Sequence, residues 1–300
     1  MRVALLVNAR SGRGRAGRLG ASAAEALSRA GHDAALVAVG PGSGGHDAAS
    51  AIDGASLAVV VGGDGTVNHL LESLAALGIP LYHLPTGNEN LLAREFGMSA
   101  SVPRLLAAVE RNRVVRTDLA RCNGRPFALM ASVGPDAGVI HRLDAVRTRA
   151  IGHSAYFRPV LGELIRPRLA RLTVTVDGEP IVEARRGFVV VANSRHYGLR
   201  IDPCPMADIA DGLLDTVFFP ASTAAGALAW MLAARCRVQF MFPSCRVARG
   251  RRIEVSADDT DAPCQIDGET GPAGIRSETS RQVVWRCAAE PGALSILAPR

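Results

Sequence analysis

The sequence predicts two lobes: an α/β lobe built on a parallel sheet, followed by a β-rich lobe. At 300 residues the chain exceeds one typical domain and can bury a sizeable core without disulfides or metals. Through the first third, short apolar runs alternate with helical stretches, which is typical of a parallel sheet covered by helices. From about residue 115 the pattern changes to paired strands with tight turns, which indicates an antiparallel second lobe.

The first lobe is expected to span residues 1–117. Its predicted strands are the apolar runs 3–7, 34–39, 57–61 and 79–84. The third run is apolar throughout, which suits a central strand covered on both faces. Helices are expected near residues 16–30, after Thr66, and up to Gly97. The second of these follows from Val67, Leu70, Leu71 and Leu74, which share one helical face.

The second lobe is expected to span residues 118–300, with the last residues free to return to the first lobe. Asn123-Gly124 is predicted to join strands 114–122 and 127–133 in a hairpin, and Asp177-Gly178 to join strands 172–176 and 181–184. A further strand is expected at 188–192. Two helical interruptions are predicted, roughly at 139–169 and 222–234.

Composition excludes several functions. The net charge is +6 and all 34 basic residues are arginines. Without lysine the chain cannot hold a P-loop, a protein-kinase strand lysine or a pyridoxal Schiff base. The basic excess is interpreted as a solvated arginine-rich face, and no nucleic-acid partner is expected. Six widely spaced cysteines without metal-ligand spacing indicate buried thiols in a reducing, cytoplasmic setting. The first residues form too short an apolar run for a signal peptide.

Three glycine-containing loops carry the strongest functional signal. They are Asn8-Ala9-Arg10-Ser11-Gly12, Gly62-Gly63-Asp64-Gly65-Thr66 and Pro85-Thr86-Gly87-Asn88-Glu89-Asn90. A strand that ends in such a loop before a helix offers backbone N–H groups and a positive dipole end to phosphate oxygens. Each loop alone could be a turn or a cap. In a parallel sheet, however, all three meet at the carboxyl edge, where ligands bind.

An aspartate inside the second loop is unusual for a phosphate site. Asp64 would repel a phosphate unless a divalent cation lies between them, so it indicates Mg²⁺ binding or proton acceptance. The alternative is that Asp64 caps the following helix.

Residues 12–17 also match G-x-G-x-x-G, the fingerprint of dinucleotide-binding folds. In the dinucleotide-binding fold, the first glycine directly follows the first strand and an acidic residue ends the second strand. Here four residues separate Val7 from Gly12, and the nearest acid, Asp33, precedes the second strand. NAD-dependent redox chemistry is therefore less favoured than phosphoryl transfer.

At these loops the chain resembles the catalytic domain of diacylglycerol kinases, sphingosine kinases and bacterial lipid kinases, which are distantly related to NAD kinases. The resemblance covers nearly the whole chain. In the second half it rests on Ser132 to Ala137, on Asn193 with Tyr197-Gly198 and on Pro205 to Ala207. It continues through two acidic stretches, Asp211 to Asp215 and Gln265 to Glu269.

The resemblance implies an α/β nucleotide-binding lobe, a β-sandwich lobe and a cleft between them. It also implies ATP and Mg²⁺ as cofactors, and a lipid alcohol as the acceptor, reached by transient peripheral contact with the inner membrane face. A homodimer is compatible with it. The nucleotide would be held by Asn8, Ser11, Gly12, Gly62, Gly63, Gly65, Thr66, Gly87, Asn88, Asn90 and Glu269.

The same resemblance assigns the acidic residues. Asp64 would belong to the metal and phosphate network, Asp211 would help bind a structural Mg²⁺, and Asp267 would be the general base. An alcohol that attacks a γ-phosphoryl group needs a carboxylate to accept its proton and a metal to spread charge. Asp177-Gly178-Glu179 repeats the triplet at Asp267, but its alternating flanks are explained by a plain hairpin turn.

Two alternatives stay open at this point. An NAD kinase relative would phosphorylate a soluble hydroxyl, although the Asn8 to Gly12 loop argues against it. A nucleotide-binding module without catalysis is suggested by two departures from the family pattern, at Asn88 and Leu91. No Gly-x-Ser-x-Gly elbow occurs, so the sequence does not indicate a hydrolase of that kind. The residues therefore favour a lipid kinase over both alternatives.

Overall fold

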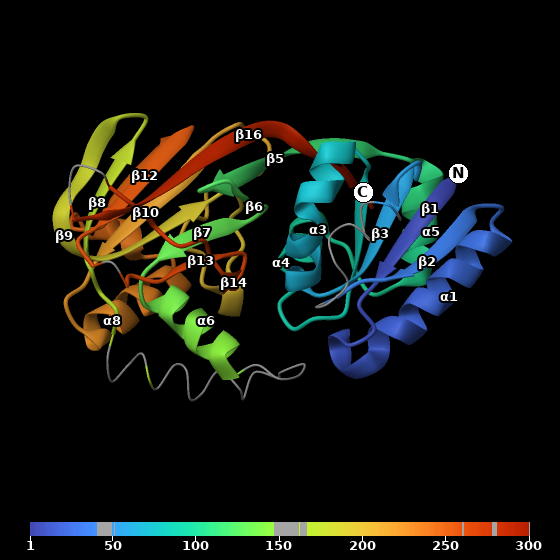
Figure 1. The fold of residues 1–300 in the computed structure, drawn as a ribbon, viewed down its shortest axis with the longest axis horizontal. Helices are drawn as coiled ribbons and strands as arrows, with labels where there is room; N and C mark the ends of the chain where they lie inside the picture. Colours follow the sequence, from blue (N-terminus) through green and yellow to red (C-terminus); the bar gives the residue numbers. More distant parts are fainter. Residues whose placement is uncertain are drawn as a thin grey trace. The chain divides into compact units, whose positions relative to one another are not determined.

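The protein is described from a computed structural model (Figure 1). It covers residues 1–40, 50, 52–146, 162, 167–259, 261–277 and 281–299. The chain divides into two compact units: residues 1–117 with 292–300, and residues 118–291. Each unit is described by itself.

Unit 1 is an α/β fold with a parallel sheet. Its strands are β1 (Arg2–Val7), β2 (Asp33–Ala38), β3 (Leu57–Gly62) and β4 (Leu81–Pro85), joined at one edge by the end of β16 (Val283–Leu297). Its helices are α1 (Arg15–Arg29), α3 (Asp64–Leu77), α4 (Leu91–Phe96) and α5 (Val102–Arg111), and a short 3₁₀ turn, η1 (Ser11–Gly14), precedes α1.

The strand order of this sheet is β16-β4-β3-β1-β2. Strand β3 is buried at every position, because helices cover both faces of the sheet, as a continuous apolar run requires. Figure 1 shows α1 and α3 on opposite faces of the sheet, and α5 packs beside α1. The predicted parallel α/β lobe is thus confirmed, and its four predicted strands lie within two residues of the observed ones.

Unit 2 is a β-sandwich whose two layers share one long strand. The first layer contains β8 (Arg171–Val176), β12 (Arg252–Ala257) and β16. The second contains β7 (Met130–Val133), β10 (Leu214–Pro220), β11 (Arg246–Gly250), β13 (Cys264–Ile266) and β14 (Glu269–Thr270). The remaining strands are β5 (Val114–Cys122), β6 (Arg125–Phe127) and β15 (Ile275–Arg276).

Strand β9 (Glu179–Ala192) connects the two layers. Its first half pairs with β8, and its second half, from Gly187, pairs with β10 and β7. A strand changes layers through a bulge or bend, and here the bend lies near Ala184, whose φ is +45°. Val189 and Val191 then face the core between the layers, whereas Phe188 and Val190 face a second buried cluster that includes Ala227 of α8 (Ala224–Arg235).

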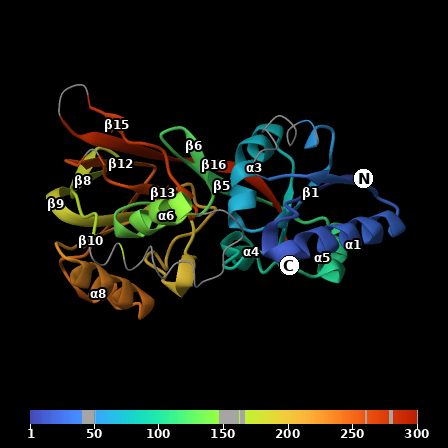
Figure 2. The same ribbon diagram turned by 60° about the horizontal axis from the view of Figure 1, so that its bottom comes forward.

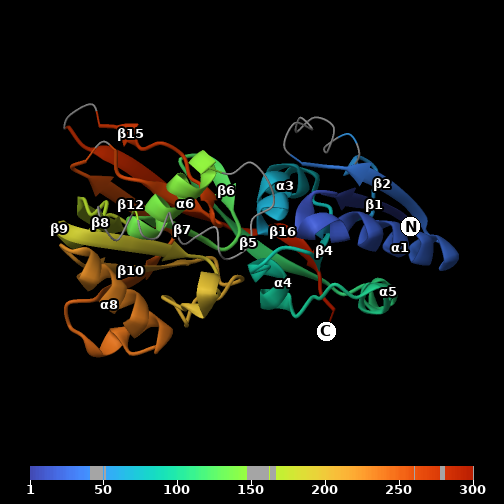
Figure 3. The same cartoon turned by 90° about the horizontal axis from the view of Figure 1, so that it is seen from below.

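Two helices cover the second layer. Helix α6 (Pro135–Val146) packs on β13 and β14, as Figure 2 shows, and α8 (Ala224–Arg235) packs on β10 (Figure 3). Two 3₁₀ turns, η3 (Gly198–Arg200) and η4 (Gln239–Met241), lie in the connecting segments. None of the helices in the described residues is both long and apolar enough to cross a bilayer.

Several predicted boundaries in unit 2 were wrong. The run 127–133 is two strands, β6 and β7, since the backbone at residues 128–130 turns to donate hydrogen bonds to Asp267. The runs 181–184 and 188–192 form one strand, β9. The predicted helix 139–169 ends too late, because residues 167–170 are not helical, while 147–161 and 163–166 lie outside the described residues. Five cysteines are buried as expected, but Cys236 is exposed.

Candidate nucleotide-binding and catalytic site

The three glycine loops of unit 1 lie at the carboxyl edge of the sheet, around a topological switch point. From β1 the chain moves to β2 on one side, and from β3 it moves to β4 on the other. Connections that leave in opposite directions place their helices on opposite faces, and ligands of open α/β sheets bind where the two connections part. The loops after β1 and β3 flank this point.

Side-chain hydrogen bonds join the loops to one another. The Asn8 side chain donates from Nδ2 to Thr66 Oγ1 at 3.0 Å, which links the first loop to the second. Thr86 donates to Ser11 Oγ at 2.8 Å, which links the third loop to the first. The Ser11 hydroxyl keeps its own proton to donate. Asn8, Ser11 and Thr66 therefore hold the loops together, whatever else they contact.

Glycines are needed because the loops approach one another closely. A Cβ on Gly87 would lie 2.8 Å from the Gly63 Cα, and a Cβ on Gly12 would lie 2.6 Å from the Thr86 carbonyl oxygen. Gly12 also has a φ of +60°, which glycine adopts readily. A Cβ on Gly62 would lie 2.5 Å from Thr66 Oγ1. Glycine at these positions is therefore required by the packing of the loops against one another.

Asn90 shapes the third loop through its amide. Its Oδ1 accepts from the Gly87 N–H at 2.9 Å, and its Nδ2 donates to the Gly87 carbonyl at 2.8 Å. Asn90 itself is left-handed, with a φ of +49°, a conformation that asparagine tolerates better than most residues. The observed contacts of Asn90 thus fix Gly87. The predicted nucleotide contacts of Asn90 and of its neighbour Asn88 stay predictions.

Asp64 occupies the first position of α3. The N-cap is Gly63, with no side-chain cap, so the alternative that Asp64 is the N-cap residue is wrong. Gly65 and Thr66 follow in the first turn. The N-terminus of a helix offers N–H groups and a partial positive charge to an anion. Asp64 adds a hard oxygen donor beside them, which is the kind of ligand that Mg²⁺ prefers.

His83 supports the second loop from inside the sheet. The side chain is fully buried on β4, and its Nε2 lies 3.0 Å from the Gly62 carbonyl oxygen. Burial lowers the pKa of His83 to about 4, against a smaller opposing effect of the bond to Gly62. The ring is therefore neutral near pH 7, and it holds Gly62 by donating from Nε2. Sequence reasoning missed this residue, because a histidine at a strand end carries no specific signal.

In unit 2, Asp267 is a buried residue at the turn between β13 and β14. It is 6% exposed. Its Oδ1 accepts from the N–H groups of Leu129 and Met130 at 2.9 and 3.0 Å, and its Oδ2 accepts from the Ala128 N–H at 2.8 Å. Each carboxylate oxygen can accept about two hydrogen bonds. Asp267 therefore has a clear structural function, beside the role of general base that was predicted for it.

The two Asp-Gly-Glu triplets form the same kind of turn. Asp177 and Gly178 have φ values of +50° and +92°, and Asp267 and Gly268 have +50° and +79°, which is the type I′ pattern of two-residue hairpins. The hairpin predicted at Asp177 is thus confirmed. The triplets differ in burial, since Asp177 is exposed where its carboxylate accepts from the amides of Arg251 and Arg252.

A chain of hydrogen bonds connects the Asp267 turn to Tyr197. Gln265 accepts from the Gly268 N–H at 2.8 Å and donates to Ser132 Oγ at 2.9 Å. Ser132 and Tyr197 both donate to Asp136. Burial, and then the Asp136 carboxylate, raise the pKa of Tyr197, so its hydroxyl stays protonated and donates. No role was predicted for these four side chains, although all of them lie in stretches that carried the family resemblance.

Asp211 has a different countercharge from the one predicted. Its carboxylate pairs with Arg249, which also lies 3.4 Å from Asp215. Burial raises the pKa of Asp215, and Arg249 opposes this effect. Within the described part of the chain, no group of three or more His, Cys, Asp or Glu residues could hold a metal ion. In this structure Arg249 balances the charge of Asp211, and the role of Asp211 as a ligand of a structural Mg²⁺ stays a prediction.

Comparisons with known proteins agree with this architecture. Residues 2–122 match the model of the diacylglycerol kinase catalytic domain, and residues 130–298 match the YegS C-terminal NAD kinase beta sandwich-like domain. A diacylglycerol kinase of Mycobacterium tuberculosis is 28% identical over 260 residues, which are 84% of this chain and 80% of the relative. A solved diacylglycerol kinase structure from Bacillus anthracis has a TM-score of 0.71 at 16% identity, with 99% of this chain and 96% of that chain covered.

Proposed function

Because this chain belongs to the family that joins a diacylglycerol kinase catalytic domain to a YegS C-terminal domain, we propose that it is an ATP- and Mg²⁺-dependent lipid kinase. The γ-phosphoryl group of ATP would pass to the hydroxyl of diacylglycerol or of a related long-chain alcohol. The observation that carries the proposal is the set of interlocked glycine loops at the switch point of unit 1.

The loops supply what a polyphosphate needs. Gly12, Gly63 and Gly87 let the three loops pack closely at the carboxyl edge of the sheet, and the N-terminus of α3 directs N–H groups and a positive dipole end to the same edge. Ser11 adds a hydroxyl donor. In phosphoryl transfer, catalysis comes almost entirely from alignment and electrostatic stabilisation, so a rigid, preorganised loop cluster supports this reaction class.

Magnesium bound with the nucleotide would neutralise the charge of the β- and γ-phosphates. Asp64 is the residue of unit 1 that fits it, because its carboxylate stands beside the phosphate-binding helix end, where it would otherwise repel the nucleotide. Asp211, which pairs with Arg249 in this structure, is proposed as a ligand of a second, structural ion.

Asp267 is the proposed general base of the transfer. The acceptor hydroxyl would lose its proton to the Asp267 carboxylate while its oxygen forms the bond to the γ-phosphorus, and the bond from the γ-phosphorus to the β-phosphate oxygen of ATP would break. The three backbone donors fix the carboxylate in one orientation. Glu269, on β14 next to this turn, would assist in nucleotide binding.

A radiolabelled assay tests the proposal. Wild-type protein, [γ-³²P]ATP and Mg²⁺ are incubated with diacylglycerol in mixed micelles, with other long-chain alcohols, or with NAD. We expect label in the lipid fraction and a loss of at least 100-fold in Asp64→Asn, which keeps the fold by circular dichroism. Label in NAD alone would replace the lipid kinase by an NAD kinase-like enzyme. ATP binding without transfer to any acceptor would favour the non-catalytic module and sink the proposal.

A further inference from the structure

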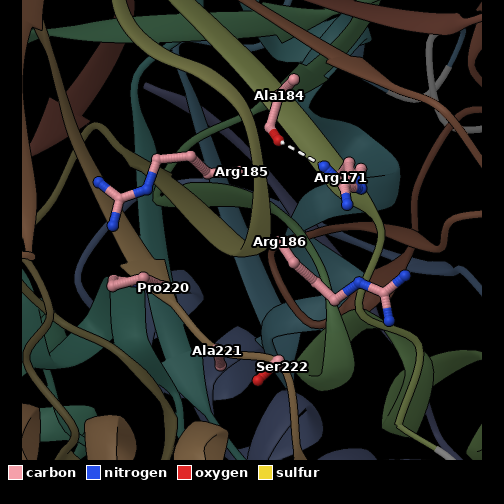
Figure 4. A pocket seen from close by; sticks show the side chains of 7 residues that line it. All are labelled: Arg171, Ala184, Arg185, Arg186, Pro220, Ala221 and Ser222. Atoms are coloured by element: carbon pink, nitrogen blue, oxygen red, sulfur yellow. Dashed lines mark hydrogen bonds between the residues drawn. The ribbon is translucent and has the colours of Figure 1, made fainter.

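A hollow lined by arginines lies in unit 2, at the corner where β9 passes from one layer of the sandwich to the other. It has a volume of about 370 Å³. Figure 4 shows Arg171, Arg185 and Arg186 around it, with Pro220, Ala221 and Ser222 along one side. No residue of the predicted kinase site lines this hollow.

Without a bound anion, the arrangement of these arginines lowers the stability of the folded protein. Arg171 lies directly opposite Arg186 in the β8–β9 pair, and Arg185 occupies the next position, opposite Leu172. Like charges directly across a strand pair are destabilising. No acidic residue lines the hollow, and none of the three guanidinium groups pairs with a carboxylate among the residues that the structure describes. Asp258 lies nearby, but there it accepts from the backbone N–H of Arg171.

Strand geometry brings two of the three side chains together: Arg171 and Arg186 are opposite each other in the β8–β9 pair, whereas Arg185 extends the other way (Figure 4). The left-handed backbone of Ala184 creates the bend before Arg185 and Arg186, and strain of this kind clusters at ligand sites. Arg171 donates to the Ala184 carbonyl at 3.5 Å. Gly187 keeps the strand against β10, because a Cβ there would lie 2.3 Å from the Phe219 carbonyl oxygen. Arg171 and Arg186 are thus held side by side at this corner.

The lining also contains an apolar part. The guanidinium carbon of Arg185 lies 5.9 Å from the centre of the Phe218 ring, which fixes this cation over an aromatic face. Pro220 and Ala221 add apolar surface, and Ser222 adds an exposed hydroxyl. Planar guanidinium groups bind phosphate oxygens in pairs, and several of them match a tetrahedral anion with two charges better than a carboxylate.

From this geometry we infer that the β9 corner is a binding site for a phosphate ester, separate from the nucleotide loops. The phosphate contacts Arg171 and Arg186, and the organic part of the ester lies against Pro220 and Ala221. The same chemistry is offered by a soluble phosphate ester and by the headgroup of an anionic phospholipid. The inference needs no assumption about the reaction that the protein catalyses.

The chain provides a matched control for the test. Arg251 and Arg252 are also adjacent, exposed arginines of unit 2, and they lie outside the hollow. The double variants R185Q/R186Q and R251Q/R252Q therefore remove the same charge from the same unit. R171Q, on the other strand, is a second variant that leaves β9 unchanged.

Calorimetric titration with glycerol 3-phosphate tests the soluble source, and co-sedimentation with phosphatidylcholine vesicles with or without phosphatidic acid tests the lipid source. We expect wild type and R251Q/R252Q to bind at least one probe, and R185Q/R186Q and R171Q to bind it at least tenfold more weakly. Loss with glycerol 3-phosphate identifies a soluble ester, and loss with vesicles alone identifies a headgroup. Equal weakening in both double variants, or no binding by wild type, would overturn the inference.

A thermal measurement distinguishes binding from a change in folding. If the site binds phosphate, glycerol 3-phosphate or short-chain phosphatidic acid raises the Tm of wild type and of R251Q/R252Q, but not that of R185Q/R186Q. Without ligand, R186Q alone, which keeps the contact of Arg185 with Phe218, should have a Tm equal to or above that of wild type, because the repulsion between Arg171 and Arg186 is removed. A clearly lower Tm would show that these arginines support the fold instead of a ligand.

Discussion

At the scale of single residues, Asp267 combines a proposed chemical role with a structural one. Its carboxylate accepts from three backbone amides in a buried turn. An asparagine there would keep one acceptor oxygen and would point an N–H₂ group at the Ala128 N–H. A buried donor without an acceptor costs about 1–3 kcal/mol. Loss of activity in Asp267→Asn would therefore not by itself identify a base.

We expect Asp267→Asn to lower the free energy of unfolding by about 2–3 kcal/mol. Asp177→Asn is the matched control, because Asp177 lies in the same turn type and also accepts backbone amides, but is exposed to water. Water replaces the lost bond there, so the control should lose less than about 1 kcal/mol. Urea unfolding of both variants measures the difference. Equal losses would show that burial of Asp267 has no part in the effect.

His83 makes the stability of the protein depend on pH. Its pKa is about 4 in the folded protein, below the ordinary value of 6.5, so the unfolded chain binds a proton more readily. This contribution is fully present above pH 6.5 and is lost as the pH falls towards 4, by roughly 3 kcal/mol in all. We expect His83→Gln to remove this part of the pH dependence in denaturant unfolding between pH 7 and 4. An unchanged slope would contradict a buried, neutral His83.

At the scale of elements, the pattern of apolar residues predicted those strands whose formation depends on residues close in the sequence. The apolar runs at 3–7 and 57–61 became β1 and β3, since burial on both faces requires an unbroken run. The break between β6 and β7 was not predictable, because it depends on Asp267, which lies 137 or more positions away along the chain. A bend such as that at Ala184 also has no local sequence signal, since alanine rarely adopts a positive φ.

In the candidate site too, features set by the local sequence were predictable and features set by distant segments were not. The convergence of the three loops followed from parallel strands alone and is confirmed by the bonds between Ser11, Thr86, Asn8 and Thr66. The choice of Asp267 over Asp177 rested on the family resemblance, because both triplets form the same local turn. What separates them is burial by segments distant in sequence, which one sequence without its fold does not reveal.

At the scale of the whole molecule, unit 1 is discontinuous in sequence. Residues 292–300 return to it after the whole of unit 2, and Ile296 pairs with Leu81 beside β4. Two strands, β5 and β16, cross the boundary between the units along the chain. Residues 1–117 therefore lack one edge strand of their sheet until residues 292–300 have been synthesised. Unit 1 is completed only after unit 2 has been made.

We expect a chain that ends at Pro291 to lose the structure of unit 1. The truncation removes Leu294, Ile296 and Leu297, which are at most 2% exposed. Burial of three such side chains contributes roughly 5–9 kcal/mol, which is comparable to the total stability of a domain. A chain that ends at Ala298 keeps these residues and should behave as wild type. Limited proteolysis with mass spectrometry checks this: rapid cleavage within residues 1–117 is expected only in the shorter chain, and equal resistance in both would show that β1 to β4 hold unit 1 without the returning strand.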